Sequence, residues 1–155
     1  LNVGAMLLAF VAMIALLNGL IGGVAGLAGY EGLTLQQILG WLFAPLAFLL
    51  GIPWAEAPAA GSLIGQKLVI NEFYAYANFV QIKDELSTHA QTVVTFALCG
   101  FANLTSIAIL LGGLGSIVPA RRHDIARFGL KAVLTATLAN MMSAVLAGLF
   151  YSLAA

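Results

Sequence analysis

The sequence contains very little charge. Lysine and arginine together number six, and aspartate and glutamate also number six, so charged residues make up 8% of the 155 residues. A typical soluble domain carries about 25% charged residues. Twelve charged side chains cannot cover the surface of a globule of this size in water. The net charge is zero, so composition gives no indication of a nucleic-acid partner.

The signatures of the common enzyme classes are absent as well. The sequence has no H-E-x-x-H, no G-x-S-x-G and no P-loop. The single Cys99 excludes an internal disulfide. The two histidines, His89 and His123, lie in polar linkers, which is more typical of solvated residues than of ligands. We therefore expect neither an enzyme nor a cofactor or metal site in this chain.

Apolar residues are abundant instead, at 62% of the chain. Soluble domains contain about 45–50%, so lipid is the solvent that this composition suits. The apolar run from Leu1 to Ala28 has no basic region before it and is longer than the core of a signal peptide. We interpret the chain as part of a longer membrane protein that begins inside a membrane helix.

Two segments are long enough to cross a bilayer, which takes about 20 apolar helical residues. They are residues 1–29 and 126–153. The first carries glycines three and four residues apart, at Gly19, Gly22, Gly23 and Gly26. These glycines either let another helix approach closely or simply bend a helix that faces lipid, and the sequence leaves both readings open.

The segment 30–54 predicts an interfacial or strongly tilted helix followed by a turn. Pro45 lies in its middle and makes a straight span doubtful, because proline removes a backbone donor. Trp41, Phe48 and Trp54 supply aromatic rings, which favour the boundary between membrane and water.

A helical hairpin is predicted for residues 55–80. Its two apolar halves are each too short to span, and between them stand four polar residues, Gln66, Lys67, Asn71 and Glu72. Two short helices that meet at a polar tip form a re-entrant hairpin, which is tolerated where protein or a wet cavity satisfies the tip.

A discontinuous helix is predicted for residues 90–118. Gly100 and the polar run that starts at Asn103 interrupt its apolar length near the middle. Half-helix ends of this kind bind ions and polar substrate groups in transporters. The basic segment 119–127 follows, and the positive-inside rule places it in the cytoplasm and the C-terminus outside.

Three polar side chains in these apolar segments are the candidates for a binding site. An isolated carboxylate in a membrane is costly, so Glu72 must pair, protonate or face a wet cavity; the structural alternative is a salt bridge to Lys67. Asn103 and Ser106 share a face if their stretch is helical, and the alternative for both is hydrogen bonding between helices. A carboxylate, an amide and a hydroxyl together suit a polyhydroxylated ligand.

Three motifs carry a family resemblance that covers nearly the whole chain. They are Gly65 to Phe73 (GQKLVINEF), Phe96 to Ile107 (FALCGFANLTSI) and Arg121 to Arg127 (RRHDIAR). They resemble the concentrative nucleoside transporters, particularly the C-terminal half of bacterial members, which are nucleoside:cation symporters.

The resemblance implies an all-α membrane protein that is half of an inverted-repeat transporter fold. Residues 1–29 would be a scaffold helix and residues 55–155 part of the moving transport domain of a homotrimer in the bacterial inner membrane. It assigns Glu72, Asn103 and Ser106 to the ribose of the nucleoside, with Phe101 packing beside it. Gln66, Lys67 and Asn71 are possible supporting residues.

The expected function is secondary active transport by alternating access, driven by Na+ or H+. The resemblance places the ligands of the coupling ion in an N-terminal half that this sequence does not contain, and nothing here separates purine from pyrimidine substrates. Two alternatives remain: a passive permease or channel for a small polar solute, and a non-transporting membrane subunit.

Overall fold

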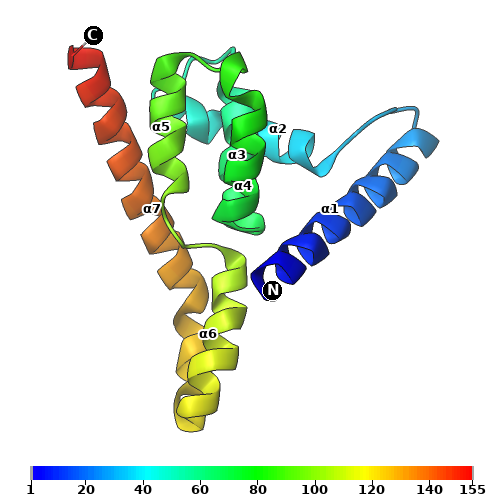
Figure 1. Cartoon of the computed structure of the whole chain (residues 1–155), viewed down its shortest axis with the longest axis vertical. Coiled ribbons are helices and arrows are strands. Elements are labelled where there is room, and N and C mark those ends of the chain that lie inside the picture. The colour runs from blue at the N-terminus through cyan, green and yellow to red at the C-terminus, as the bar shows by residue number, and fades with distance from the viewer. Residues whose placement is uncertain (1, 155) are drawn as a thin grey trace.

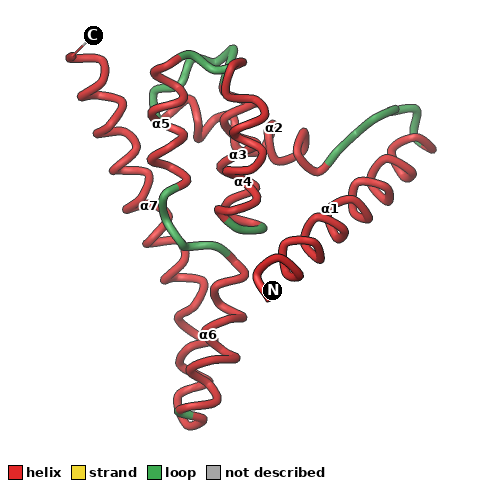
Figure 2. The backbone as a smooth tube through the Cα atoms, viewed as in Figure 1, coloured by secondary structure: helices red, strands yellow, loops and turns green. Residues whose placement is uncertain are grey.

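The computed structural model describes the backbone of residues 2–154 and the side chains of residues 8, 9 and 11–154. The outermost residues of the predicted segments 1–29 and 55–155 therefore lie outside the described residues. All regular structure in the described part of the chain is helical (Figures 1 and 2). The helices are α1 (Asn2–Leu27), α2 (Leu35–Leu49), α3 (Ala57–Val69), α4 (Glu72–Ile82), α5 (Thr88–Leu98), α6 (Leu104–Ile117) and α7 (Arg122–Ala154), with 3-10 turns η1 (Lys83–Glu85) and η2 (Pro119–Arg121).

One helix among the described residues is long and apolar enough to cross a membrane, the stretch Pro119–Ala154 that comprises η2 and α7. Shorter apolar stretches are Val11–Leu27, Leu35–Leu49 and Leu104–Ile117. Large apolar side chains on these helices are exposed, for example Leu8, Leu27 and Ile117, at 74%, 92% and 74%. In water such surface would be costly, so the exposed faces suit lipid or further protein.

The α1 helix slants away from the other helices, and a loop with two positive-φ glycines joins it to α2 (Figure 1). Its polar contact is Asn18, whose amide donates to Gln36 Oε1 at 3.0 Å and accepts from the backbone of Leu35 at 2.8 Å. Through these two hydrogen bonds, the amide of Asn18 joins the otherwise apolar α1 to the first turn of α2.

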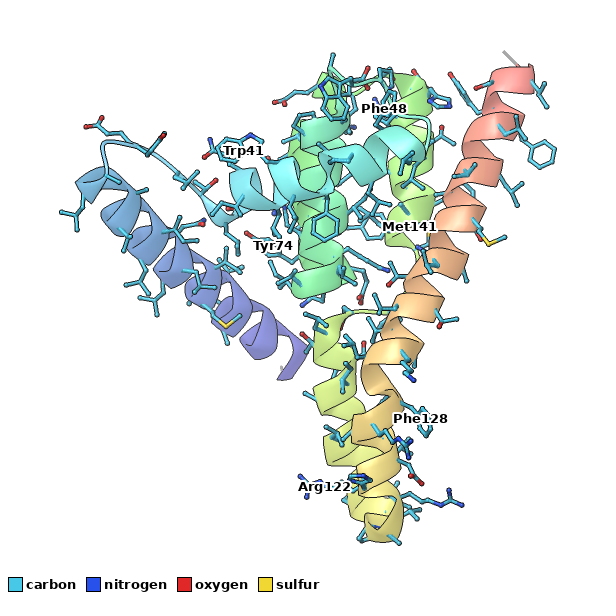
Figure 3. All side chains as sticks on the ribbon, turned by 180° about the vertical axis from the view of Figure 1, so that it is seen from behind. Trp41, Phe48, Tyr74, Arg122, Phe128 and Met141 are labelled. Carbon is cyan, nitrogen blue, oxygen red and sulfur yellow. The ribbon has the colours of Figure 1, made fainter. Side chains whose placement is uncertain are left out.

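The α2 helix crosses α3 at close range (Figure 3). A methyl group built on Gly61 would lie 2.7 Å from the backbone nitrogen of Ala44, and one on Gly40 would lie 2.8 Å from the carbonyl oxygen of Pro58. The two glycines therefore set the distance between the helices. Pro45 does not interrupt α2, which is one continuous helix of 15 residues. Its length is below the roughly 20 residues of a span.

The α3 and α4 helices form a hairpin with a very short tip at Ile70 and Asn71. Asn71 is the N-cap of α4 and accepts from the backbone of Tyr74 at 2.8 Å. The hairpin core is made of small and apolar residues, including Ala60, Leu63 and Ala75, all fully buried. The helices of the hairpin run from Ala57 to Ile82, whereas the predicted range was 55–80.

The next helix is broken: α5 ends at Leu98, and α6 begins at Leu104 after five non-helical residues. Leu104 and the residues that follow are helical, so only Asn103 of the polar run lies in the break itself. The long α7 lies beside both halves, with α5 along its C-terminal part and α6 along its N-terminal part (Figure 1). Gly129 and Gly148 permit these contacts, against Ile107 and Val93.

Two predicted linkers prove to be mostly helical. In the basic segment 119–127, residues 119–121 form η2 and the remainder is the start of α7, with Asp124 in its first turn. His89 belongs to α5, where it is half-buried and lies 6.0 Å from the ring of Tyr151, so its interpretation as a solvated linker residue was wrong. Hydropathy locates the end of an apolar stretch. It does not locate the end of the helix, which can continue into the polar residues beyond that stretch.

Candidate functional site

The hairpin tip lies against the break between α5 and α6. Two side-chain hydrogen bonds join them. Thr105 Oγ1 in the first turn of α6 donates to the carbonyl of Ile70 at 2.9 Å. Asn103 Nδ2 donates to Glu72 Oε2 at 3.0 Å. Residues about thirty positions apart in the sequence are thereby held together at the ends of three helices.

Glu72 is the first residue of α4 and is half-buried. Its carboxylate sits at a helix N-terminus, where the aligned peptide dipoles favour negative charge. The alternative interpretation, a salt bridge from Glu72 to Lys67, is wrong: among the described residues the ion pair within 4.0 Å is Arg121–Asp124. The carboxylate accepts from Asn103 and keeps acceptor capacity on its other oxygen.

Asn103 is buried, at 3% exposure, and is the N-cap of α6 with extended backbone angles. Its Oδ1 accepts from the backbone nitrogen of Ser106 at 2.8 Å, and its Nδ2 donates to Glu72. Asn103 therefore caps the helix to which Ser106 belongs. The two residues do not share a helical face, because Asn103 is not helical. Ser106 Oγ lies 2.8 Å from the Phe101 carbonyl and 2.9 Å from Asn103 Oδ1, so its one hydrogen can serve either acceptor.

Phe101 is in the middle of the break, and its side chain is 78% exposed. It borders an open cavity of about 440 Å³ that is lined by Glu72, Phe73, Tyr76, Ala77, Val80 and Phe101. The cavity therefore has apolar and aromatic walls and one carboxylate. That combination suits a ligand with a planar apolar part and a polar part that bonds to Glu72.

The three possible supporting residues act inside the hairpin. Gln66, at 2% exposure, accepts from Asn78 of α4 in a short hydrogen bond and its own amide donates to Ser62 Oγ at 2.9 Å. Lys67, also at 2%, is enclosed by the packing of α3. Asn71 caps α4. Gln66 thereby joins α3 to α4, and Asn71 caps the start of α4 beside Glu72.

Three further residues at the break did not stand out in the sequence. Thr105 bonds the hairpin tip, Tyr76 donates from its hydroxyl to the Thr95 carbonyl at 2.8 Å, and Asn140 of α7 donates to carbonyls at the end of α5. Asn140 could have been found as an isolated amide inside the apolar stretch 126–153. The other two look like ordinary helix residues until their partners are known.

No group of three or more histidine, cysteine, aspartate or glutamate side chains that could hold a metal ion occurs in the part of the chain that the structure describes. The polar atoms at the break are amides, hydroxyls, backbone carbonyls and one carboxylate. That set is suited to hydrogen bonding with a neutral polar ligand.

The comparison with known proteins gives a consistent result. A family model described as "Na+ dependent nucleoside transporter C-terminus" matches residues 1–148. An uncharacterized transporter, YutK, of Bacillus subtilis is 63% identical over 150 residues, which are 97% of this chain and 37% of that protein. The nucleoside permease NupC of Helicobacter pylori is 56% identical over 158 residues, covering 99% of this chain and 38% of the permease.

Among solved structures, CNTnw in an inward-facing substrate-bound state matches with a TM-score of 0.93 and 59% identity. The match covers 98% of this chain and 38% of CNTnw. The chain thus spans between a third and two fifths of the length of these relatives.

Proposed function

Because the chain belongs to the concentrative nucleoside transporter family, whose C-terminal region it matches, we propose that it works in a secondary active transporter that carries nucleosides across a membrane together with a cation. Within that transporter, the tip of the α3–α4 hairpin and the break between α5 and α6 bind the ribose.

The observation that carries the proposal is the chain of hydrogen bonds from Ser106 through Asn103 to Glu72, whose carboxylate lines an open cavity. The two vicinal hydroxyls of a ribose each donate one hydrogen and accept others. Glu72 accepts, whereas the amide and the hydroxyl can do both. Hydrogen bonds to a charged group are worth about 1.5–3 kcal/mol each, enough to discriminate a ribose from a sugar without these hydroxyls.

In the structure Asn103 bonds both to Glu72 and to Ser106. A ribose replaces these internal bonds: one hydroxyl donates to the carboxylate of Glu72, and Asn103 Nδ2 turns its donation toward the sugar oxygen. Phe101, exposed at the rim, lies beside the nucleoside. The ligand thus exchanges hydrogen bonds and leaves no buried polar atom unpaired, which keeps its binding favourable in a site with little water.

The driving cation is Na+ or H+. Sodium is favoured by the description of the matching family. The ligands of the coupling ion lie in the N-terminal half of the transporter.

Helix lengths and placement support an assignment of the moving parts. The helices of the hairpin have 13 and 11 residues, below the roughly 20 of a span, which supports a re-entrant hairpin whose tip ends inside the membrane. The helix α1, which slants away from the rest, is the scaffold helix of a homotrimer, and α3 to α7 move against it in alternating access (Figure 1). The basic segment 119–127 faces the cytoplasm of the bacterial cell and the C-terminus faces outside.

The test is Glu72→Gln in the full-length protein, with uptake of radiolabelled adenosine and uridine into proteoliposomes under an imposed cation gradient. Glutamine keeps the size of the side chain and removes the charge that accepts from the ribose. We expect uptake of both nucleosides to be abolished while trimers still form. Glu85→Gln, at an exposed position in η1, is the matched control and should transport normally.

Undiminished uptake by Glu72→Gln would remove this carboxylate from the site. Accumulation against a nucleoside gradient, lost on adding an ionophore, separates a symporter from a passive permease, which cannot concentrate its solute. Saturable binding of nucleoside to the purified protein separates either of these from a non-transporting membrane subunit.

A further inference from the structure

The helix α7 carries one amide in the middle of its apolar length. Asn140 is flanked by Leu138, Ala139, Met141 and Met142, and it is half-buried where α7 passes the end of α5. A polar side chain at this depth of an apolar helix is costly unless it finds a partner. Its partners therefore indicate what it does.

Asn140 Nδ2 donates to the backbone carbonyls of Phe96, at 3.2 Å, and Ala97, at 2.5 Å. Both carbonyls belong to the last turn of α5, which ends at Leu98. The final carbonyls of a helix have no partner four residues ahead. In an apolar surrounding, each such group needs another donor. The backbone N–H of Cys99 donates to the Phe96 carbonyl at 3.3 Å, and the amide of Asn140 adds a second donor there and supplies the Ala97 carbonyl.

The absence of a side chain at Gly100 leaves room for this amide. A methyl group on Gly100 would lie 2.8 Å from Cγ and 2.9 Å from Oδ1 of Asn140. Any larger residue at position 100 would push the amide off the carbonyls. The glycine of the break and the amide of α7 are therefore two parts of one contact.

The contact fixes the start of the segment that carries the ribose-binding groups. Residues 99–103 connect the capped end of α5 to Asn103, and the Phe101 carbonyl in this segment accepts from Ser106. A displaced α5 end would shift the Phe101 carbonyl and, with it, Asn103 and Ser106. From this geometry, and resting on the proposed function, we infer that Asn140 is a positioning residue that sets the ribose specificity of the site without touching the substrate.

The experiment compares Asn140→Leu with the unmodified full-length protein. Leucine has a similar size and cannot donate. The measurements are the equilibrium Kd for a ribonucleoside and for the matching 2′,3′-dideoxynucleoside, together with the number of binding sites. We expect the Kd of the ribonucleoside to rise by about tenfold, the order of one lost polar interaction, while the Kd of the dideoxynucleoside changes by less than about twofold. Ser143→Ala is the control, because Ser143 lines an open pocket together with Gly100 and Asn140 and its hydroxyl bonds only to its own helix, at Ala139.

Gly100→Ala tests the same contact from the other side and covers the case in which Asn140→Leu does not fold. It should show the same selective loss of ribonucleoside affinity. The double variant Gly100→Ala with Asn140→Ala relieves the clash but leaves the Ala97 carbonyl without its side-chain donor, so it should stay impaired. Full recovery in the double variant would show that Asn140 only fills space and would overturn the inference.

Parallel increases of both Kd values, or a loss of binding sites with unchanged Kd values, would also overturn it, since either result means a general structural role. The outcome for the proposed function is separate. If the unmodified protein bound the dideoxynucleoside as tightly as the ribonucleoside, the ribose assignment itself would fail, and the positioning role would fall with it.

Discussion

Asn103 combines two roles that a pair of substitutions can separate. It caps α6 through Oδ1, and it bonds Glu72 through Nδ2. Asn103→Ser keeps a good capping residue and removes the amide donor, whereas Asn103→Ala removes both. The loss of an N-cap costs about 0.5–2 kcal/mol, and the loss of a hydrogen bond to a charged group costs about 1.5–3 kcal/mol.

These magnitudes give distinct expectations for folding and for binding. Both variants lose the donor that serves Glu72 and the ribose, so both should bind a ribonucleoside about ten- to a hundredfold more weakly. Both variants also lose the Asn103–Glu72 hydrogen bond of the folded protein, so both should unfold at a lower temperature than the unmodified protein. Asn103→Ala loses the cap as well, so it should unfold at a lower temperature than Asn103→Ser.

The assay is equilibrium binding and thermal unfolding of the purified full-length protein, with all variants in the same detergent. Normal affinity in Asn103→Ser would refute the role of the amide in the site. Equal unfolding temperatures for the two variants would refute the capping argument, and they would do so independently of any result on binding.

Two more substitutions test the packing that places the site. Thr105→Val removes the donor to the Ile70 carbonyl at the hairpin tip and keeps the shape of the side chain. The tip should therefore exchange its amide hydrogens faster, and nucleoside affinity should fall about fivefold. The control is Thr92→Val, which should leave both quantities unchanged because the hydroxyl of Thr92 bonds only within α5. Gly61→Ala pushes a methyl group to 2.7 Å from the backbone of α2 and should lower the free energy of unfolding by about 1–3 kcal/mol, measured by thermal unfolding. The control Gly112→Ala, whose methyl group meets nothing within 4 Å, should be neutral or slightly stabilising. Equal effects of the two substitutions would contradict the close α2–α3 contact.

The sequence was most informative where an apolar helix contained polar residues. The stretch from Gln66 to Glu72 predicted two short helices and a polar tip, and the structure has a turn at Ile70 and Asn71. Gly100 and Asn103 predicted an interruption, and the helix ends at Leu98 and resumes at Leu104. Such positions are readable from sequence because a polar group in an apolar helix has to be accommodated locally.

Sequence patterns were less informative about whether the linkers are helical and about which groups a polar side chain bonds. The basic residues from Arg121 to Arg127 marked a boundary of the apolar segment but not the end of a helix, since α7 begins at Arg122. The partner of Asn140 was out of reach as well. An amide in a helix can bond to many groups, and only the crossing of α7 over the end of α5 selects two carbonyls.

Side chains from neighbouring helices form hydrogen bonds with the backbone carbonyls around the break. Tyr76 of α4 serves the Thr95 carbonyl, Asn140 of α7 serves the two that follow, and Ser106 serves Phe101. An interrupted helix in lipid would otherwise expose these carbonyls at several kcal/mol each. A ligand therefore does not have to repair the backbone. Under the proposed function, a nucleoside exchanges its hydrogen bonds with those that join Asn103 to Glu72 and to Ser106, and Glu72 is the one of the three that lines the open cavity.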